Sequence, residues 1–242
     1  MGLETDSTKT GREGGTRPGS DQGRLKLMVM ASGSGTNLKA ILEACRQGKV
    51  SAEVVLVVSD NPGALALVKA REYGVAAVAV DPSGYPSRRA HEEAIVAYAR
   101  PYEPELVVLA GYMRLVTPYF LEAFAGRLRG KPRLPGVINI HPADTKVYQG
   151  TRGYEFALGL TKGSKGRLKE TWVTVHFVDE GMDTGPVIRK RAVQVKETDT
   201  LETLKERGLA IEHELYPEVI DLIARGRVVL GEGGRVVVRD KA

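Results

Sequence analysis

The fold is decided by the stretch Leu25-Lys26-Leu27-Met28-Val29-Met30-Ala31-Ser32-Gly33-Ser34-Gly35-Thr36-Asn37-Leu38. Its first seven residues are apolar except for one lysine, a pattern that predicts a central parallel strand covered on both faces. Beyond the two glycines, apolar residues recur at helical spacing, at Leu38, Ile41, Leu42 and Cys45. A strand that runs through a glycine loop into a helix presents backbone N–H groups and a helix N-terminus, a geometry that binds anions.

The glycine loop is open to three interpretations. A dinucleotide fingerprint would place a third glycine where Leu38 stands, so Gly33-x-Gly35 alone is a weak signal. The loop is either a cradle for a phosphate monoester, a dinucleotide site with Asp60 as the ribose carboxylate, or a tight structural turn.

Strand and helix patterns alternate along most of the chain. Strands are predicted over 52–59, 76–80, 106–110 and 137–142, and helices over 64–73, 87–100, 118–125 and 154–160. Repeated units of this length predict an α/β fold: a doubly wound, mostly parallel, Rossmann-like sheet with helices on both faces and ligands at the carboxyl ends of the strands.

The C-terminal part is expected to be antiparallel. Strands over 171–178 and 187–195 have no helix between them, so they are predicted to pair antiparallel. A long amphipathic helix over 200–225 follows, with an inner face of Leu201, Leu204, Ile211, Leu215, Val219 and Ile220. A hairpin around Gly231-Glu232-Gly233-Gly234 is expected to end the chain.

Composition indicates a globular protein of 242 residues, with 42% hydrophobic and 27% charged residues. Residues 1–24 have almost nothing apolar, which predicts a disordered tail before a single domain over 25–242. The net charge of +5 comes from bases scattered among acids, which argues against a nucleic-acid partner and suits a phosphorylated small substrate. The lone Cys45 cannot form an internal disulfide, and no apolar run approaches the ~18 residues of a membrane span. We expect a cytoplasmic monomer or homodimer.

Two stretches carry candidate chemistry. In Val137–Pro142 strand alternation projects Asn139 and His141 from the same side, and the proline ends the ladder. Residues 176–188 lead from a strand into a glycine-bounded loop with three carboxylates, one of which is expected to orient His141. An amide, an imidazole and a carboxylate suit acyl transfer, because they supply a donor to an oxyanion, an acid/base and a group that orients it.

The other histidines are weaker candidates. His91 is expected to be a solvated or half-buried helix residue, His176 a hydrogen-bonded core residue, and His213 either of these. The sequence contains no zinc-ligand spacing and no Gly-x-Ser-x-Gly elbow, which argues against metal catalysis and a serine hydrolase. The polar segment 143–153 beside His141 is a candidate lid.

Four motifs in matching order resemble the glycinamide ribonucleotide formyltransferase family. The resemblance runs from about Leu25 to Ile223 and rests on Ser32-Gly33-Ser34-Gly35-Thr36-Asn37-Leu38, Leu109-Ala110-Gly111-Tyr112-Met113-Arg114, Asn139-Ile140-His141-Pro142 and Val175-His176-Phe177-Val178-x-x-x-x-Asp183-x-Gly185-Pro186. It implies transfer of a formyl group from the co-substrate 10-formyltetrahydrofolate to the amine of glycinamide ribonucleotide, in purine synthesis.

The resemblance also implies roles for individual residues. Asn139, His141 and Asp183 would be the catalytic trio, with Asp183 raising the pKa of the histidine. Gly35, Thr36 and Asn37 would hold the substrate's phosphate, and Glu212 would lie near its ribose. The folate would contact Arg88 (through its glutamate tail), Met113, Arg114, Leu115, Val116, Asn139, Asp179, Glu180, Gly181 and Met182. No metal is implied.

The chain departs from the family pattern beside this site. After His-Pro the family usually continues Ser-Leu-Leu-Pro, whereas Ala143-Asp144-Thr145-Lys146 follows here, and Arg152 stands where the family places a histidine. Insertions lie near Gly130–Gly136 and Gly163–Lys169. These departures bear on loop behaviour and on the choice of acceptor.

Competing functions remain open at the level of sequence. Methionyl-tRNA formyltransferase and formyltetrahydrofolate hydrolase share motifs with this chain but would need a C-terminal tRNA-binding domain and an N-terminal regulatory domain, respectively. We expect neither domain in the segments that flank 25–225. A formyltransferase for another amine, or a non-catalytic nucleotide-binding protein, are the further alternatives.

Overall fold

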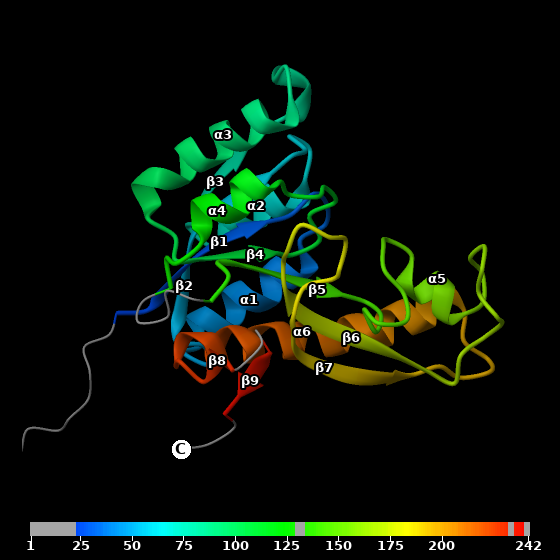
Figure 1. The fold of residues 1–242 in the computed structure, drawn as a ribbon. Helices are drawn as coiled ribbons and strands as arrows, with labels where there is room; N and C mark the ends of the chain where they lie inside the picture. The colour runs from blue at the N-terminus through cyan, green and yellow to red at the C-terminus, as the bar shows by residue number, and fades with distance from the viewer. Residues whose placement is uncertain (1–22, 129–133, 232–234, 240–242) are drawn as a thin grey trace, which may run out of the picture.

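A seven-stranded sheet with the order β3-β2-β1-β4-β5-β6-β7 forms the centre of the protein (Figure 1). Its strands are β1 (Leu25–Met30), β2 (Ala52–Ser59), β3 (Ala76–Ala79), β4 (Leu106–Leu109), β5 (Val137–His141), β6 (Glu170–Phe177) and β7 (Val187–Gln194). The first five strands pair in parallel, whereas β6 pairs antiparallel with both β5 and β7. The predicted doubly wound sheet with an antiparallel C-terminal part is confirmed.

The structure is a computed structural model that describes residues 23–128, 134–231 and 235–239. The tail predicted over 1–24 therefore lies almost entirely outside the described residues. So do the turn of the terminal hairpin, at 232–234, and most of the insertion near Gly130–Gly136.

Helices cover both faces of the sheet. They are α1 (Thr36–Arg46), α2 (Leu65–Glu72), α3 (Arg88–Ala99), α4 (Pro118–Phe124), α5 (Gly153–Ala157) and α6 (Leu201–Ala224), with single 3₁₀ turns at Pro82–Gly84 and Arg100–Tyr102. In Figure 1, α3 and α4 lie above the sheet, and α1 and α6 lie below it. Across the described ranges no helix combines the length and apolarity that a bilayer span requires.

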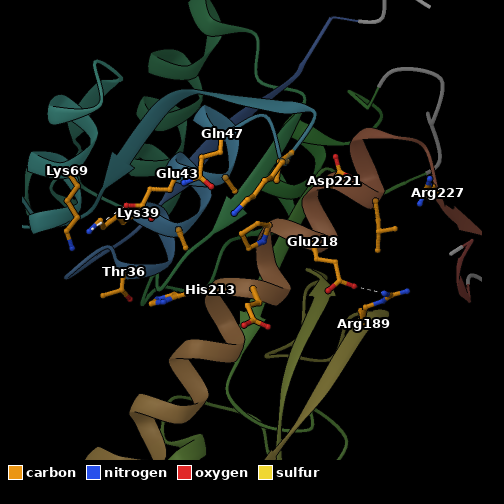
Figure 2. Close-up of a pocket in the computed structure, with 17 residues that line it drawn as sticks. Thr36, Lys39, Glu43, Gln47, Lys69, Arg189, His213, Glu218, Asp221 and Arg227 are labelled. Carbon is orange, nitrogen blue, oxygen red and sulfur yellow. Dashed lines mark hydrogen bonds and ion pairs between the residues drawn. The ribbon is translucent and has the colours of Figure 1, made fainter. Parts of the chain in front are cut away.

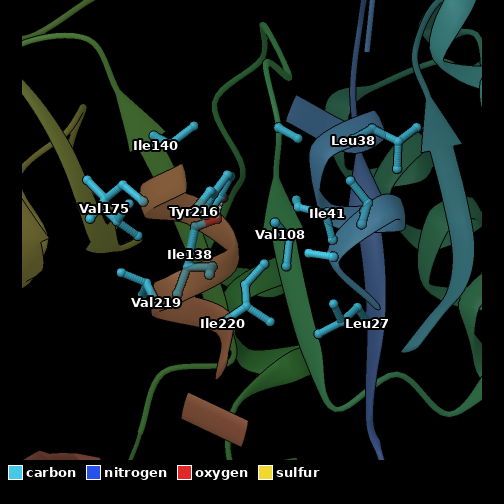
Figure 3. Packing of buried hydrophobic residues seen from close by; sticks show 14 of the residues in the cluster. Leu27, Leu38, Ile41, Val108, Ile138, Ile140, Val175, Tyr216, Val219 and Ile220 are labelled. Atoms are coloured by element: carbon cyan, nitrogen blue, oxygen red, sulfur yellow. Dashed lines mark hydrogen bonds between the residues drawn. The ribbon is translucent and has the colours of Figure 1, made fainter. Parts of the chain in front are cut away.

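Alternation along β1 explains why both faces are covered. Leu27 and Val29 enter a cluster that also holds side chains of α1, α2 and α6, whereas Met28 and Met30 enter the cluster below α3 and α4. Figure 3 shows the first cluster, in which Tyr216 of α6 packs over the sheet. The Tyr216 hydroxyl lies 2.9 Å from the Leu109 carbonyl and 3.2 Å from the Ile138 carbonyl, so α6 is fixed against the end of β4 and the start of β5.

Some local expectations were wrong. α5 ends at Ala157 rather than near residue 160. His91 is not solvated: it is buried, and its Nε2 lies 2.8 Å from the Val80 carbonyl oxygen. Of the inner face predicted for α6, Leu201 and Ile211 are only partly buried, and the buried face also includes Gly208 and Glu212. The terminal strands β8 (Val228–Leu230) and β9 (Val236–Val238) pair antiparallel as predicted, in a small sheet of their own.

Candidate active site

The end of β5 delivers two polar side chains to one side of the sheet. Ile138 and Ile140 pack into the core on the α1 and α6 face, and Asn139 and His141 therefore project to the opposite side. Antiparallel pairing places His176 of β6 opposite Asn139. The predicted geometry of the Asn139 and His141 pair is confirmed.

Asp183, in the loop between β6 and β7, binds both of these side chains. One carboxylate oxygen, Oδ2, lies 3.4 Å from His141 Nδ1 and accepts the Gly150 backbone N–H at 3.0 Å. The other, Oδ1, accepts from Asn139 Nδ2 at 3.2 Å and lies 3.5 Å from His176 Nε2. Of the three carboxylates in this loop, Asp183 is the one that contacts His141.

Burial and the neighbouring Asp183 carboxylate act on the pKa of His141 in opposite directions. Burial lowers the pKa of His141 below its ordinary value, although the Asp183 carboxylate and the Tyr148 carbonyl favour the charged imidazole. Asp183 therefore acts in the predicted direction, but burial outweighs it. Burial alone would raise the pKa of Asp183, whereas the hydrogen bond with His176, the charge of His141 and the Gly150 N–H together lower it.

The segment after Pro142 folds back over the histidine. The Tyr148 carbonyl oxygen lies 3.1 Å from His141 Nε2, and the Tyr148 ring stacks on Phe156 with 4.5 Å between ring centroids. The residues that depart from the family pattern anchor the base of this segment. Asp144 binds the Lys190 ammonium at 2.5 Å, and the Ala143 carbonyl accepts from Thr174 Oγ1 at 2.7 Å. That the segment acts as a lid stays a prediction.

A pocket of about 280 Å³ opens beside this cluster. It brings together most of the predicted site residues: Asn37, Met113, Arg114, Leu115, Val116, Asn139, His141, Asp179, Glu180, Gly181, Met182, Asp183 and Glu212. Gly35, Thr36 and Arg88 do not line it. Met113, Leu115 and Met182 are largely exposed apolar side chains among the lining residues, so the pocket offers apolar surface to a ligand.

The 112–116 segment is held from two sides. The Met113 N–H donates to Ser32 Oγ at 2.9 Å, which ties the segment to the end of β1. Its far end is held by Glu92 of α3, whose carboxylate accepts the Thr117 N–H at 2.8 Å and also binds the Thr117 hydroxyl. Arg88 lies one helical turn before Glu92 and is exposed. It does not line the pocket.

The glycine loop ends at an N-terminus of α1 that has no side-chain cap. Gly35 has φ +67°, and a Cβ atom there would lie 2.8 Å from Ala66 Cα, so the position requires glycine. The first turn of α1 contains no acidic residue, and Lys69 places its ammonium 2.6 Å from the Ser34 carbonyl. These features suit an anion.

A second hollow, of about 1030 Å³, adjoins the glycine loop on the other side of the contact between α1 and α6. Figure 2 shows Thr36, Lys39 and Lys69 at one end of it and Glu218, Asp221 and Arg227 at the other. Thr36 therefore faces this groove, whereas its neighbour Asn37 faces the smaller pocket.

Comparison with known proteins identifies the family. The model of the formyl transferase family matches residues 25–220. The chain belongs to this family. It is 38% identical over 197 residues to phosphoribosylglycinamide formyltransferase of Bacillus subtilis. The aligned region covers 81% of this chain and 92% of that protein. It is 35% identical over 208 residues to the Escherichia coli enzyme of that name, covering 86% of this chain and 91% of that protein.

A solved structure shares the fold of this formyl transferase. It is glycinamide ribonucleotide transformylase 1 from Symbiobacterium toebii, which is 42% identical and superposes with a TM-score of 0.81 over 91% of this chain and 96% of that chain. The resemblance inferred from the four sequence motifs is confirmed.

Sequence reasoning missed two contacts in the site of this formyl transferase. His176 is a hydrogen-bonded core histidine as expected, with Nδ1 2.8 Å from the Phe177 carbonyl, but its Nε2 also contacts Asp183. Tyr154 binds Glu212. Only the register of β6 on β5 and the docking of α5 on α6 reveal these two contacts, and neither can be deduced from spacing along the chain.

Metal ligation has no candidate in the parts of the chain that the structure describes. No group of three or more His, Cys, Asp or Glu side chains there is arranged to hold an ion.

Proposed function

We propose that this protein transfers the formyl group of 10-formyltetrahydrofolate to the primary amine of glycinamide ribonucleotide, in purine synthesis. The observation that carries the proposal is the meeting of Asn139, His141 and Asp183 in one pocket of a chain that belongs to the formyl transferase family. Two relatives named for this reaction align with this chain over more than nine-tenths of their own length.

The three side chains supply what formyl transfer needs. When the amine attacks, its new bond to the formyl carbon leaves charge on the formyl oxygen, and Asn139 and protonated His141 donate to that oxygen. Asp183 stays against His141 Nδ1 at 3.4 Å, so the other ring nitrogen, Nε2, which lies 3.1 Å from the Tyr148 carbonyl, offers its N–H to the formyl oxygen. Protonated His141 gives its own proton to the folate nitrogen as the old carbon–nitrogen bond breaks, and the neutral imidazole then takes the proton that the attacking amine loses. Asp183 fixes the ring and favours its charged form.

The apolar part of the pocket suits a flat folate. Met113, Leu115, Val116 and Met182 would contact its rings, together with the Asp179–Asp183 loop. The co-substrate supplies the formyl carbon, and these residues orient it toward His141. Arg88 is exposed one turn from the Glu92 contact with this wall, where its cation would pair with the glutamate tail of a folate that leaves the pocket.

The acceptor would span from the glycine loop to the trio. We assign its phosphate to Gly35, Thr36 and Asn37, because the uncapped N-terminus of α1 and the nearby Lys69 favour an anion. Glu212 borders the same pocket as His141, which suits contact with the ribose. The proposal includes a cytoplasmic enzyme, monomeric or homodimeric, formed by a single domain over 25–242 and acting on small molecules.

The test is an assay of purified protein for tetrahydrofolate, with and without glycinamide ribonucleotide. We expect product only when the acceptor is present, and formylated acceptor in equal amount. Release of formate at the same rate without acceptor would make the protein a hydrolase. Absence of both products, with ligand binding retained, would leave a non-catalytic binding protein.

A further inference from the structure

A chain of buried polar groups joins three helices beside the catalytic pocket. Glu212 of α6 accepts the Tyr154 hydroxyl at 2.7 Å on Oε1 and the Asn37 side-chain N–H at 2.7 Å on Oε2. All three residues are more than nine-tenths buried. Asn37 and Glu212 line the pocket, whereas Tyr154 does not, so Tyr154 acts on the site only through Glu212.

The hydrogen bonds fix the orientation of the Asn37 amide. A carboxylate only accepts, so Asn37 must turn its Nδ2 toward Glu212. Its Oδ1 is then left buried without a hydrogen-bond donor among the described residues. A buried acceptor without a donor is unfavourable, so this oxygen favours a donor from outside the chain, from a water or from a ligand.

Tyr154 fits this arrangement closely. Gly208 lies one helical turn before Glu212, and a Cβ atom at this glycine would lie 2.0 Å from the Tyr154 hydroxyl oxygen. Burial and the charge of Glu212 raise the pKa of Tyr154, so the phenol keeps its proton and remains a donor. Each Glu212 oxygen uses one lone pair on a protein donor, which leaves the others for a ligand.

We propose that Tyr154 is a positioning residue for the sugar of the acceptor, holding Glu212 so that its carboxylate and Asn37 Oδ1 accept two neighbouring hydroxyls. A vicinal diol supplies the two O–H donors that these oxygens need. A phosphate dianion supplies none, so the Asn37 side chain faces the sugar and the phosphate is left to backbone N–H groups of the loop. The inference rests on the proposed function in taking the acceptor to be a ribonucleotide.

The arrangement makes the site selective for a ribose. A site whose buried acceptors lose their donors binds the analogue without the hydroxyl poorly, because those acceptors stay unpaired. Removal of a sugar hydroxyl and removal of the Tyr154 hydroxyl therefore weaken the same contact, the one between Glu212 and the sugar. Their effects on binding affinity should not add.

The test compares Tyr154→Phe with Tyr73→Phe. Tyr73 donates to the Glu43 carboxylate at 3.1 Å on the far side of α1, so this control removes the same type of hydrogen bond away from the pocket. Calorimetric titration with methyl β-ribofuranoside 5-phosphate and its 2-deoxy analogue measures sugar binding without formyl transfer. Melting curves verify the fold, and Glu212→Gln serves the same comparison if Tyr154→Phe does not fold.

We expect Tyr154→Phe to weaken binding of the ribose probe about 10-fold, the scale of one hydrogen bond to a charged group, and binding of the deoxy probe less than 3-fold. Tyr73→Phe should change neither. In steady state the KM for the acceptor should rise by a similar factor, while kcat and the KM for folate stay within 3-fold. Equal weakening of both probes, or an unchanged affinity for the ribose probe, would overturn the inference. Wild-type protein that prefers the ribose probe but does not formylate glycinamide ribonucleotide would overturn only the proposed function.

Discussion

Asp183 is the residue on which the hydrogen bonds of the site converge, and its backbone has φ +54°. A non-glycine residue in this left-handed region costs on the order of 1–3 kcal/mol. In this conformation the Asp183 carboxylate contacts His141, His176, Asn139 and the Gly150 N–H. Backbone strain is therefore accompanied by a full set of charge-assisted contacts at this position.

The trio can be tested by single substitutions. His141→Ala and Asp183→Asn should each fold and lose about 10²- to 10⁴-fold in turnover, the range for a positioned acid/base and its electrostatic partner. His91→Asn is the control, because that histidine is buried, is hydrogen-bonded to the Val80 carbonyl and does not line the pocket. It should lose stability and keep its turnover. Near-normal turnover in folded His141→Ala would contradict the mechanism.

The lowered pKa of His141 predicts how stability depends on pH. Burial places the pKa of the folded protein below the ordinary 6.5, so between these two values the unfolded chain binds a proton that the folded protein does not. This contribution to stability is complete above about pH 6.5 and is lost as the pH falls. Each pKa unit corresponds to about 1.4 kcal/mol. Urea unfolding from pH 7.5 to 5 should show a shallower loss for His141→Gln than for wild type, and equal slopes would refute the assignment.

For single residues, the sequence predicts the side of a strand from which a side chain projects better than it predicts how deeply that side chain is buried. Period-two alternation was enough to place Asn139 and His141 on one side of β5. The sign of the His141 pKa shift depends on how deeply the ring is buried, and the burial of His91 depends on how α3 packs on the sheet. Both follow from packing between segments far apart in the chain, which a local pattern does not contain.

The start of a helix was predictable where the sequence places a capping residue such as serine or threonine before it. Ser87 accepts the Ala90 N–H at the start of α3, and Thr200 and Thr203 form a capping box at the start of α6. α5 is a single short turn, and its start at Gly153 has no side-chain cap. Its docking depends on contacts such as that of Tyr154 with Glu212, which explains why its end was misplaced.

The glycine loop makes a prediction about the element that it begins. Gly35→Ala should lower the free energy of unfolding by on the order of 1–3 kcal/mol, since alanine is strained at this φ and its Cβ would collide with Ala66. Gly33→Ala is the matched control, because nothing lies within 4 Å of a Cβ there. Chemical denaturation of both variants measures the difference. Equal losses would mean that the loop has no special requirement at Gly35.

Across the whole molecule, the order of the strands determines where the site lies. β1 lies between β2 and β4, so the strand order reverses at β1, and a crevice opens at the carboxyl ends beside the start of α1. Sequence predicts this class of arrangement. It does not predict that α6 returns along the same face and brings Glu212 to Asn37, because these two residues are 175 positions apart in the chain.

This layout separates the anchor of the acceptor from its reacting end. The glycine loop follows β1, whereas His141 ends β5, and β4 lies between these two strands. Binding energy gained at a remote phosphate can hold the amine in line with the formyl carbon. We therefore expect the dephosphorylated riboside of glycinamide ribonucleotide to lose about 10²-fold in kcat as well as affinity. Initial rates at saturating folate and rising riboside separate the two parameters. A riboside with normal kcat and only a higher KM would show that the phosphate contributes binding alone, and that the loop does not align the amine.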